Sequence, residues 1–209
     1  MTYNPIIHHR RSIRLKGYDY SKAGLYFITI CVQDRKCLFG KIVGAGLAPA
    51  QNDKDAQKYV DVQMELNEFG KIAYNQWAKL PDRFSNFELD VFQIMPNHMH
   101  GIVLLNEPVG ATLAVAQNET VERDVDWAGA SPAPTTVGDM VGAYKSLVVN
   151  DCLEQCKLIR PNEILGKLWQ RNYYEHIIQN EKSYQQITDY IINNPSNWKD
   201  DKFYNPSNN

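Results

Sequence analysis

Short runs of apolar and β-branched residues, separated by turn-forming residues, predict the strands of this protein. Four such runs lie at residues 24–32, 87–95, 98–105 and 168–178. The first run is aromatic and β-branched almost throughout, which is typical of a buried strand. Pro96 and Asn97 separate the second run from the third, which indicates a tight antiparallel connection. A shorter run at 38–43 can pair back as one more strand.

Apolar residues at helical spacing predict three helices, at residues 67–80, 136–156 and 182–193. Pro81 follows the first helix and Pro195 follows the last, and proline does not continue a helix. Thr136, with Asp139 three residues later, resembles a capping box at the start of the second helix.

The order of the predicted elements, strand-helix-strand-strand-helix-strand-helix, indicates an α+β fold. The first six elements match the ferredoxin-like β-α-β-β-α-β arrangement, an antiparallel sheet with helices on one face. The seventh element is an additional C-terminal helix. We expect residues 1–209 to form a single domain, with irregular insertions at about 44–63 and 106–135, where no periodicity is visible.

Charge is unevenly distributed along the chain, although the net charge is only −2. The second insertion contains five acidic residues and one arginine, so the rest of the chain is slightly basic. A basic arm at residues 8–16 contains no acidic residue. Its cationic residues are Arg10, Arg11, Arg14 and Lys16. Such an arm is suited to binding phosphate groups, but a solubilising tail has the same composition.

The sequence lacks the patterns of a membrane or secreted protein. No run of about 18 apolar residues is present, so we expect no transmembrane helix. The N-terminal residues lack the apolar core of a secretory signal. The four cysteines form no Cys-x-x-Cys pair, which argues against a zinc ribbon and indicates free thiols in a reducing cytoplasm.

Two of the five histidines, His98 and His100, lie two residues apart in the third predicted strand. Side chains at positions i and i+2 of a strand point to the same face, so the two imidazoles are expected to lie side by side. Histidine is the commonest metal ligand, and such a pair is able to share a cation. Two unrelated histidines at the start of a strand give the same short pattern.

Tyr190 and Asn194 lie four residues apart on the last predicted helix and therefore share one of its faces. If that helix folds back over the sheet, the tyrosine hydroxyl approaches the histidine pair. A divalent cation held there would polarise a phosphodiester, and a phenol would attack it. Imidazole favours transition metals whereas phosphate chemistry often uses Mg²⁺, so we expect Mg²⁺ or Mn²⁺. Tyr190 as a core residue with its hydroxyl at the edge is the alternative.

Several stretches in this order resemble the single-tyrosine HUH transposases and, within them, the REP-associated tyrosine transposases. One of them is Met95-Pro96-Asn97-His98-Met99-His100-Gly101-Ile102, and the specificity comes from all the stretches occurring in this order. The other matching stretches are residues 10–15, 17–20, 26–30, 144–146, 168–178 and 189–195. Together they span most of the chain outside the two insertions.

The resemblance implies His98, His100 and Asn194 as metal ligands and Tyr190 as the nucleophile. The wider family usually has Gln where this chain has Asn194, and Asn before Pro is similar to the REP-associated branch. The implied chemistry is cleavage and rejoining of single-stranded DNA through a 5′-phosphotyrosine, with Mg²⁺ or Mn²⁺ as cofactor. The implied partner is single-stranded or hairpin DNA, bound by a monomer or a homodimer.

Other residues carry weaker expectations. Lys145 and Arg171 are plausible phosphate contacts, with solvated surface positions as the alternative. Tyr173 and Tyr174 are able to stack on bases. His176 is expected to be a buried histidine, with a group that supports a metal ligand as the alternative. Two other functions remain open: a DNA or RNA hairpin-binding protein without cleavage activity, and a metal-dependent hydrolase that uses water as its nucleophile.

Overall fold

The computed structural model describes residues 22–44, 62–106, 136–159 and 166–206. Four strands form an antiparallel sheet in the order β4-β5-β1-β6. Their bounds are β1 Gly24–Cys31, β4 Phe87–Met95, β5 His98–Leu105 and β6 Tyr174–Ile178. The predicted α+β fold with an antiparallel sheet is confirmed, and the strand predicted at 98–105 begins and ends where β5 does.

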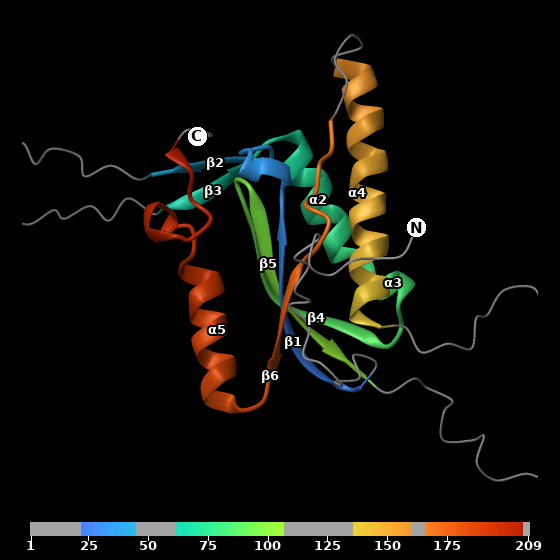
Figure 1. Cartoon of the computed structure of the whole chain (residues 1–209), viewed down its shortest axis with the longest axis vertical. Helices are drawn as coiled ribbons and strands as arrows, with labels where there is room; N and C mark the ends of the chain where they lie inside the picture. The colour runs from blue at the N-terminus through green and yellow to red at the C-terminus, as the bar shows by residue number, and fades with distance from the viewer. Residues whose placement is uncertain (1–21, 45–61, 107–135, 160–165, 207–209) are drawn as a thin grey trace, which may run out of the picture.

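Helices cover both faces of this sheet (Figure 1). One face carries α2, Glu68–Ala78, and α4, Val137–Ile159, which contribute Trp77 and Tyr144 to the larger apolar core. The opposite face carries α5, Glu181–Asn193, whose Ile191 packs in a second, smaller core. The C-terminal helix therefore folds back over the sheet on the face away from the other two helices.

The alternation of side chains along β5 divides its residues between the two cores. Met99 and Val103 belong to the core beneath α2 and α4, whereas Ile102 belongs to the core beneath α5. Because side chains in a strand alternate, His98 and His100 share the α5 face with Ile102. The burial pattern of the sheet thus places both imidazoles below the helix that carries Tyr190.

Gly101 lies between His100 and Ile102 in β5. Its backbone packs against Trp77 of α2. A Cβ atom at this position would lie 2.9 Å from Cζ2 of Trp77 and 3.2 Å from Cβ of Phe92. Trp77 is fully buried. The absent side chain therefore gives the indole ring the room in which it packs.

The short strand predicted at 38–43 exists but has a different partner. It forms β2, Gly40–Val43, which pairs with β3, Gln63–Leu66, in a separate two-stranded sheet. The prediction that it pairs back on the first strand is wrong. β3 also begins at the end of the stretch expected to be irregular, and residues 45–61 lie outside the described part of the chain.

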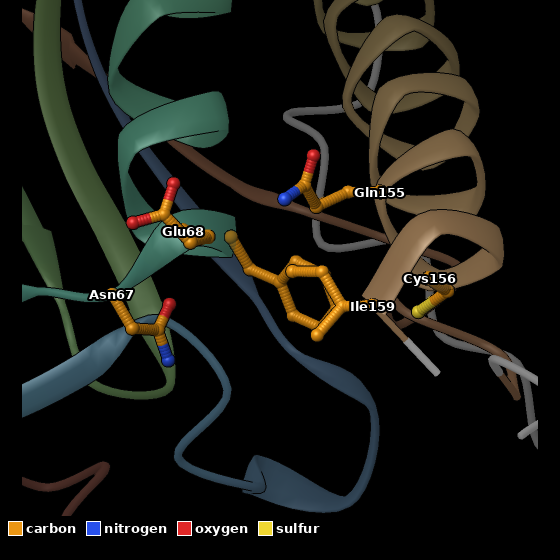
Figure 2. Close-up of a pocket in the computed structure, with 6 residues that line it drawn as sticks. Asn67, Glu68, Gln155, Cys156 and Ile159 are labelled. Carbon is orange, nitrogen blue, oxygen red and sulfur yellow. The ribbon is translucent and has the colours of Figure 1, made fainter. Parts of the chain in front are cut away.

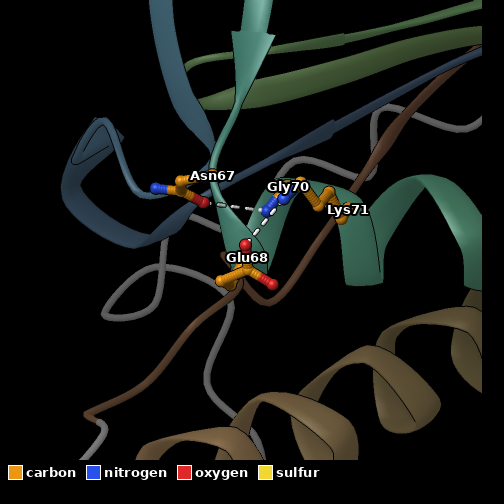
Figure 3. A network of polar contacts seen from close by, with 4 residues as sticks. All are labelled: Asn67, Glu68, Gly70 and Lys71. Carbon is orange, nitrogen blue, oxygen red and sulfur yellow. Dashed lines mark hydrogen bonds and ion pairs between the residues drawn. The ribbon is translucent and has the colours of Figure 1, made fainter. Parts of the chain in front are cut away.

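The N-cap residue of the first helix is Asn67, and its side chain is hydrogen-bonded to the first helical turn (Figure 3). The Asn67 Oδ1 atom accepts a hydrogen bond from the Gly70 amide at 3.0 Å, and Lys71 pairs with Glu68 at 2.7 Å. The helix ends at Ala78, and Pro81 lies in the first turn of a short following helix, α3 Leu80–Arg83. Proline suits a first turn because its missing N–H has no intrahelical partner there.

The capping box predicted at the second helix is present in both directions. The Thr136 amide donates to Asp139 Oδ2 at 2.9 Å, and the Asp139 amide donates to Thr136 Oγ1 at 3.2 Å. The helix continues three residues past the predicted end, to Ile159.

Only the second half of the strand predicted at 168–178 pairs as a strand. Before β6, the chain makes a single bridge between Trp169 and Val32. The Lys145 ammonium donates to the carbonyl oxygens of Gln170, Arg171 and Asn172 at 2.9, 3.3 and 3.2 Å. These carbonyl groups are thus satisfied by one side chain of α4.

The four cysteines are free thiols, as predicted. Within the described ranges, no helix is both long enough and apolar enough to cross a membrane.

Replacing Gly101 with alanine should destabilise the fold, because the new methyl group would meet the indole of Trp77. We expect the free energy of unfolding to fall by about 1–3 kcal/mol in urea denaturation. Gly142→Ala is the matched control, since nothing lies within 4 Å of a Cβ at that exposed position of α4. It should be neutral or stabilising by up to about 1 kcal/mol. Equal stability of the two variants would contradict the close packing at Gly101.

Lys145→Met should lower the free energy of unfolding by about 1–3 kcal/mol, because three backbone carbonyl groups lose their donor. Lys157→Met, at an exposed position of the same helix, should change stability by less than about 0.5 kcal/mol. Urea denaturation of both variants measures the difference. A Lys145→Met variant that is as stable as wild type would contradict this structural role of the side chain.

Candidate active site

The two imidazoles predicted to lie side by side meet through their Nε2 atoms, which are 2.9 Å apart. His98 and His100 are both fully buried, at the end of β5 nearest the C-terminal residues 194–204. The ring centroids are 4.4 Å apart. The alternation of the strand therefore brings two nitrogen donors to one point.

A buried amide assigns the tautomer of His98. The Asn97 Nδ2 group donates to the carbonyl oxygens of Arg35 and Phe203, at 3.2 and 2.8 Å. Its Oδ1 atom is therefore the acceptor facing His98 Nδ1 at 2.8 Å, so that nitrogen carries the proton. Burial, with help from Lys202 and Arg35, lowers the pKa of His98 to about 3. The ring is neutral near pH 7 and offers its Nε2 lone pair.

His100 is neutral for the same reasons. Burial lowers its pKa well below the usual value, and the neighbouring His98 lowers it further. Its Nδ1 atom lies 2.8 Å from Oγ1 of Thr29, the residue paired with it on β1. A metal ion binds one nitrogen of a neutral imidazole whose other nitrogen is hydrogen-bonded to a polar group.

Tyr190 stands over this pair from the last turn of α5. Its hydroxyl oxygen lies 3.1 Å from His100 Nε2 and donates to Asp201 Oδ2 at 2.8 Å. Burial raises the pKa of Tyr190, and the hydrogen bond to the Asp201 carboxylate raises it further. The phenol therefore keeps its proton near pH 7. The side chain is still 39% exposed, so a large substrate has access to it.

Asn194 and Asp201 complete the polar cluster. Asn194 is the C-cap of α5 and only 1% exposed. Its Nδ2 group donates to Asp201 Oδ2 at 2.8 Å, while its buried Oδ1 atom has no hydrogen-bond partner among the described residues. An orphaned buried acceptor is costly unless something else binds it.

The donor set fits a divalent cation. Donor atoms of His98, His100 and Asp201 all lie within 4.8 Å of one another. Two neutral imidazoles and a carboxylate, with the orphaned oxygen of Asn194 close by, are ligands that Mn²⁺ and Mg²⁺ accept. This fit rests on the residues themselves and leaves the identity of the ion open.

Sequence reasoning missed Asp201, which no motif or periodicity marks. It lies in the segment after α5, which folds back against the histidines through Trp198 and Phe203. The ring centroids of these two residues are 5.9 and 4.6 Å from that of His98. Two large aromatic residues after Pro195 were the available signal that this segment docks onto the sheet.

The other predicted residues have different outcomes. The basic arm, with Arg10, Arg11, Arg14 and Lys16, lies outside the described residues, and its role stays a prediction. Lys145 is occupied by backbone carbonyl groups and Arg171 is exposed, so phosphate contacts by either remain untested. His176 is exposed on β6, so the expectation of a buried histidine is wrong.

A separate pocket lies between the start of α2 and the end of α4, on the other side of the sheet (Figure 2). Its lining residues are Asn67, Glu68, Phe69, Gln155, Cys156 and Ile159. Because α2 and α4 cover the face opposite α5, this pocket is no part of the histidine and tyrosine cluster.

Two of the solved structures that resemble this chain are transposases of low similarity to it, and no protein-family model matches the sequence. One is a REP-associated tyrosine transposase bound to a REP hairpin, with 18% identity and a TM-score of 0.47 over 88% of this chain and 74% of that chain. The other is a "putative transposase" from Deinococcus radiodurans, with 17% identity and a TM-score of 0.36 over 86% and 95%. Likeness at this level adds nothing on activity.

Two relatives from Haemophilus influenzae are similar in sequence. One, named "Putative REP-associated tyrosine transposase", is 24% identical over 180 residues, which are 85% of this chain and 73% of that protein. The other, named "Uncharacterized protein", is 39% identical over 202 residues, which are 97% of each chain. The protein therefore belongs to the family of this second H. influenzae protein and is related to the REP-associated tyrosine transposases, as its motifs predicted.

Proposed function

We propose that this protein is a metal-dependent DNA strand transferase that cleaves and rejoins single-stranded DNA through a covalent bond to Tyr190. The observation that carries the proposal is the position of the Tyr190 hydroxyl, 3.1 Å from His100 Nε2 and partly exposed to solvent. A tyrosine on the surface of a helix does not require two buried neutral imidazoles next to its hydroxyl for the stability of the fold. A phenol that attacks a phosphodiester bound at those imidazoles does need them.

The proposed step is a transesterification. The Tyr190 oxygen attacks the scissile phosphorus and the bond from phosphorus to the 3′ oxygen breaks. The phenol loses one proton and the leaving 3′ oxygen takes up one proton to become a 3′-hydroxyl. The product is a 5′-phosphotyrosine. Because one phosphodiester replaces another, the reverse attack by a 3′-hydroxyl rejoins the strand without ATP.

We assign His98, His100 and Asn194 as the residues that would hold the cation, and we propose Asp201 as a further ligand because its carboxylate lies close to both histidines. A bound Mg²⁺ or Mn²⁺ would polarise the phosphate and stabilise negative charge that develops in the transition state. The protein supplies the rest. Thr29 and Asn97 orient the two imidazoles, and Asp201 orients the phenol through a hydrogen bond of 2.8 Å.

DNA is the proposed substrate because the chain is related to a protein named as a REP-associated tyrosine transposase. Hairpin DNA suits the proposal because a hairpin offers a stem for reading by shape and unpaired bases for reading by stacking. Arg10, Arg11, Arg14, Lys16, Lys145 and Arg171 remain the proposed phosphate contacts. A hairpin-binding protein without cleavage activity is the alternative that the first experiment below separates.

Incubation with Mn²⁺ and a labelled single-stranded oligonucleotide carrying a hairpin should give a covalent adduct on a denaturing gel. Tyr190→Phe should abolish the adduct, because only the attacking oxygen is removed. Tyr74→Phe is the control, since that tyrosine of α2 is exposed but lies on the opposite face of the sheet. An adduct that persists in Tyr190→Phe refutes the assignment. Binding without any adduct in wild type would favour the hairpin-binding alternative, and cleavage by Tyr190→Phe would favour water as nucleophile.

Mn²⁺ titration of the DNA-free protein by calorimetry tests the cation site independently of activity. Wild type should bind one ion, and the His98→Gln, His100→Gln double variant should not. Asp201→Asn should weaken binding about 10-fold to 100-fold, because the carboxylate charge is removed. His176→Gln, at an exposed histidine of the same sheet, should bind as wild type does. Unchanged binding in the double variant would exclude the paired imidazoles as ligands.

A further inference from the structure

Two cationic side chains lie close to a buried aromatic ring next to the proposed active site. Arg35 Cζ lies 5.2 Å and Lys202 Nζ 4.7 Å from the centroid of the Phe203 ring. Phe203 is buried, whereas Lys202 is exposed and Arg35 is half-buried. The two cationic groups therefore reach solvent around a fixed apolar support.

The Phe203 ring lies close to the two histidines as well as to these two cations. The Phe203 centroid is 4.6 Å from that of His98 and 5.8 Å from that of His100. Guanidinium and ammonium groups bind phosphate through charge-assisted hydrogen bonds, so two such groups beside the proposed attack site suit a phosphate group.

The Arg35 cation is also held in place. The Arg35 guanidinium donates from Nη1 to the Lys202 carbonyl oxygen at 2.9 Å, which joins the loop after β1 to the C-terminal segment. Asp34 and Arg35 have φ angles of 56° and 53°, a left-handed conformation that non-glycine residues rarely adopt. Strained backbone of this kind persists where the surrounding structure enforces it and is concentrated at binding sites.

An exposed tyrosine lies beside this pair. Tyr174 is 46% exposed, and its ring centroid is 6.3 Å from that of Phe203. It pairs on the sheet with Thr29, whose hydroxyl contacts His100. Paired residues point to the same face, so the Tyr174 ring stands on the active-site side of the sheet with much of its surface in solvent.

We propose that Arg35, Lys202 and Tyr174 form a subsite for the nucleotide next to the scissile phosphate. The two cations bind the phosphate of that nucleotide and the Tyr174 ring stacks on its base. Stacking on an aromatic ring tolerates any base, so the subsite orients the strand and does not read its sequence. The subsite rests on the proposed function, because a strand cleaved at Tyr190 must continue past the histidines on one side or the other.

A structural role alone would give these residues a different behaviour. If the cations served only to cover Phe203, removing one would affect stability and leave DNA binding unchanged. If Tyr174 were only an exposed residue of an edge strand, its replacement would change neither property.

Binding is measured by fluorescence anisotropy with a labelled single-stranded oligonucleotide at several salt concentrations, in a Tyr190→Phe background that prevents cleavage. Lys202→Gln should reduce the slope of log affinity against log salt by about 0.7, the value for one phosphate contact to a single strand. Tyr174→Ala should weaken binding about 5-fold to 100-fold, as loss of one stacked base does. Tyr174→Phe should restore most of it, because the ring is kept.

Lys79→Gln is the matched control, an exposed lysine at the end of α2 on the opposite face of the sheet, and its salt slope should stay as in the background. Unchanged affinity and slope in Lys202→Gln and Tyr174→Ala, in a protein whose Tyr190 still forms the adduct, would overturn the subsite and leave the proposed function standing. A background protein that binds no oligonucleotide at all would overturn both. Thermal unfolding of each variant shows whether a loss of binding follows a loss of fold.

Discussion

The buried side chain of Asn97 joins three segments that are far apart in the sequence. Its amide group donates to carbonyl oxygens of Arg35 and Phe203, and its oxygen accepts from His98. These three contacts tie the loop after β1, the start of β5 and the C-terminal segment together. Because a buried amide with unmet hydrogen bonds is costly, all three segments are held in one arrangement. The orientation of the first imidazole, and hence of the whole polar cluster, depends on this arrangement.

The cluster is built from neutral and weakly reactive groups. Burial keeps His98 and His100 uncharged and keeps the proton on Tyr190. Donor atoms of the two imidazoles and of the Asp201 carboxylate then lie within 4.8 Å of one another, and the Asn194 oxygen has no hydrogen-bond partner among the described residues. In the proposed function a cation would bind these atoms and complete the site. The same chain without a cation has a protonated phenol, so reactivity would be tied to metal binding.

Predictions from sequence were accurate wherever the pattern was local and regular. Strand β5 and the helices α2 and α5 were found within a few residues, because burial of one face imposes a period of two or 3.6 on the apolar positions. Predictions of strand pairing failed for short or irregular segments, because their partners depend on the rest of the fold. β2 pairs with β3 and not with β1. Before β6, the described chain makes only the bridge between Trp169 and Val32, and Lys145 bonds the carbonyl groups of residues 170–172.

The sequence by itself determined that His98 and His100 share one face of a strand and that Tyr190 and Asn194 share one face of a helix, since both follow from the geometry of a single element. Only the tertiary structure decided that these two faces meet, with Tyr190 at 3.1 Å from His100. It also decided that Asp201 joins them, because that residue arrives on an irregular segment fixed by packing of Trp198 and Phe203 against His98. Contacts between distant segments depend on the summed packing of the whole core, and no local period records them.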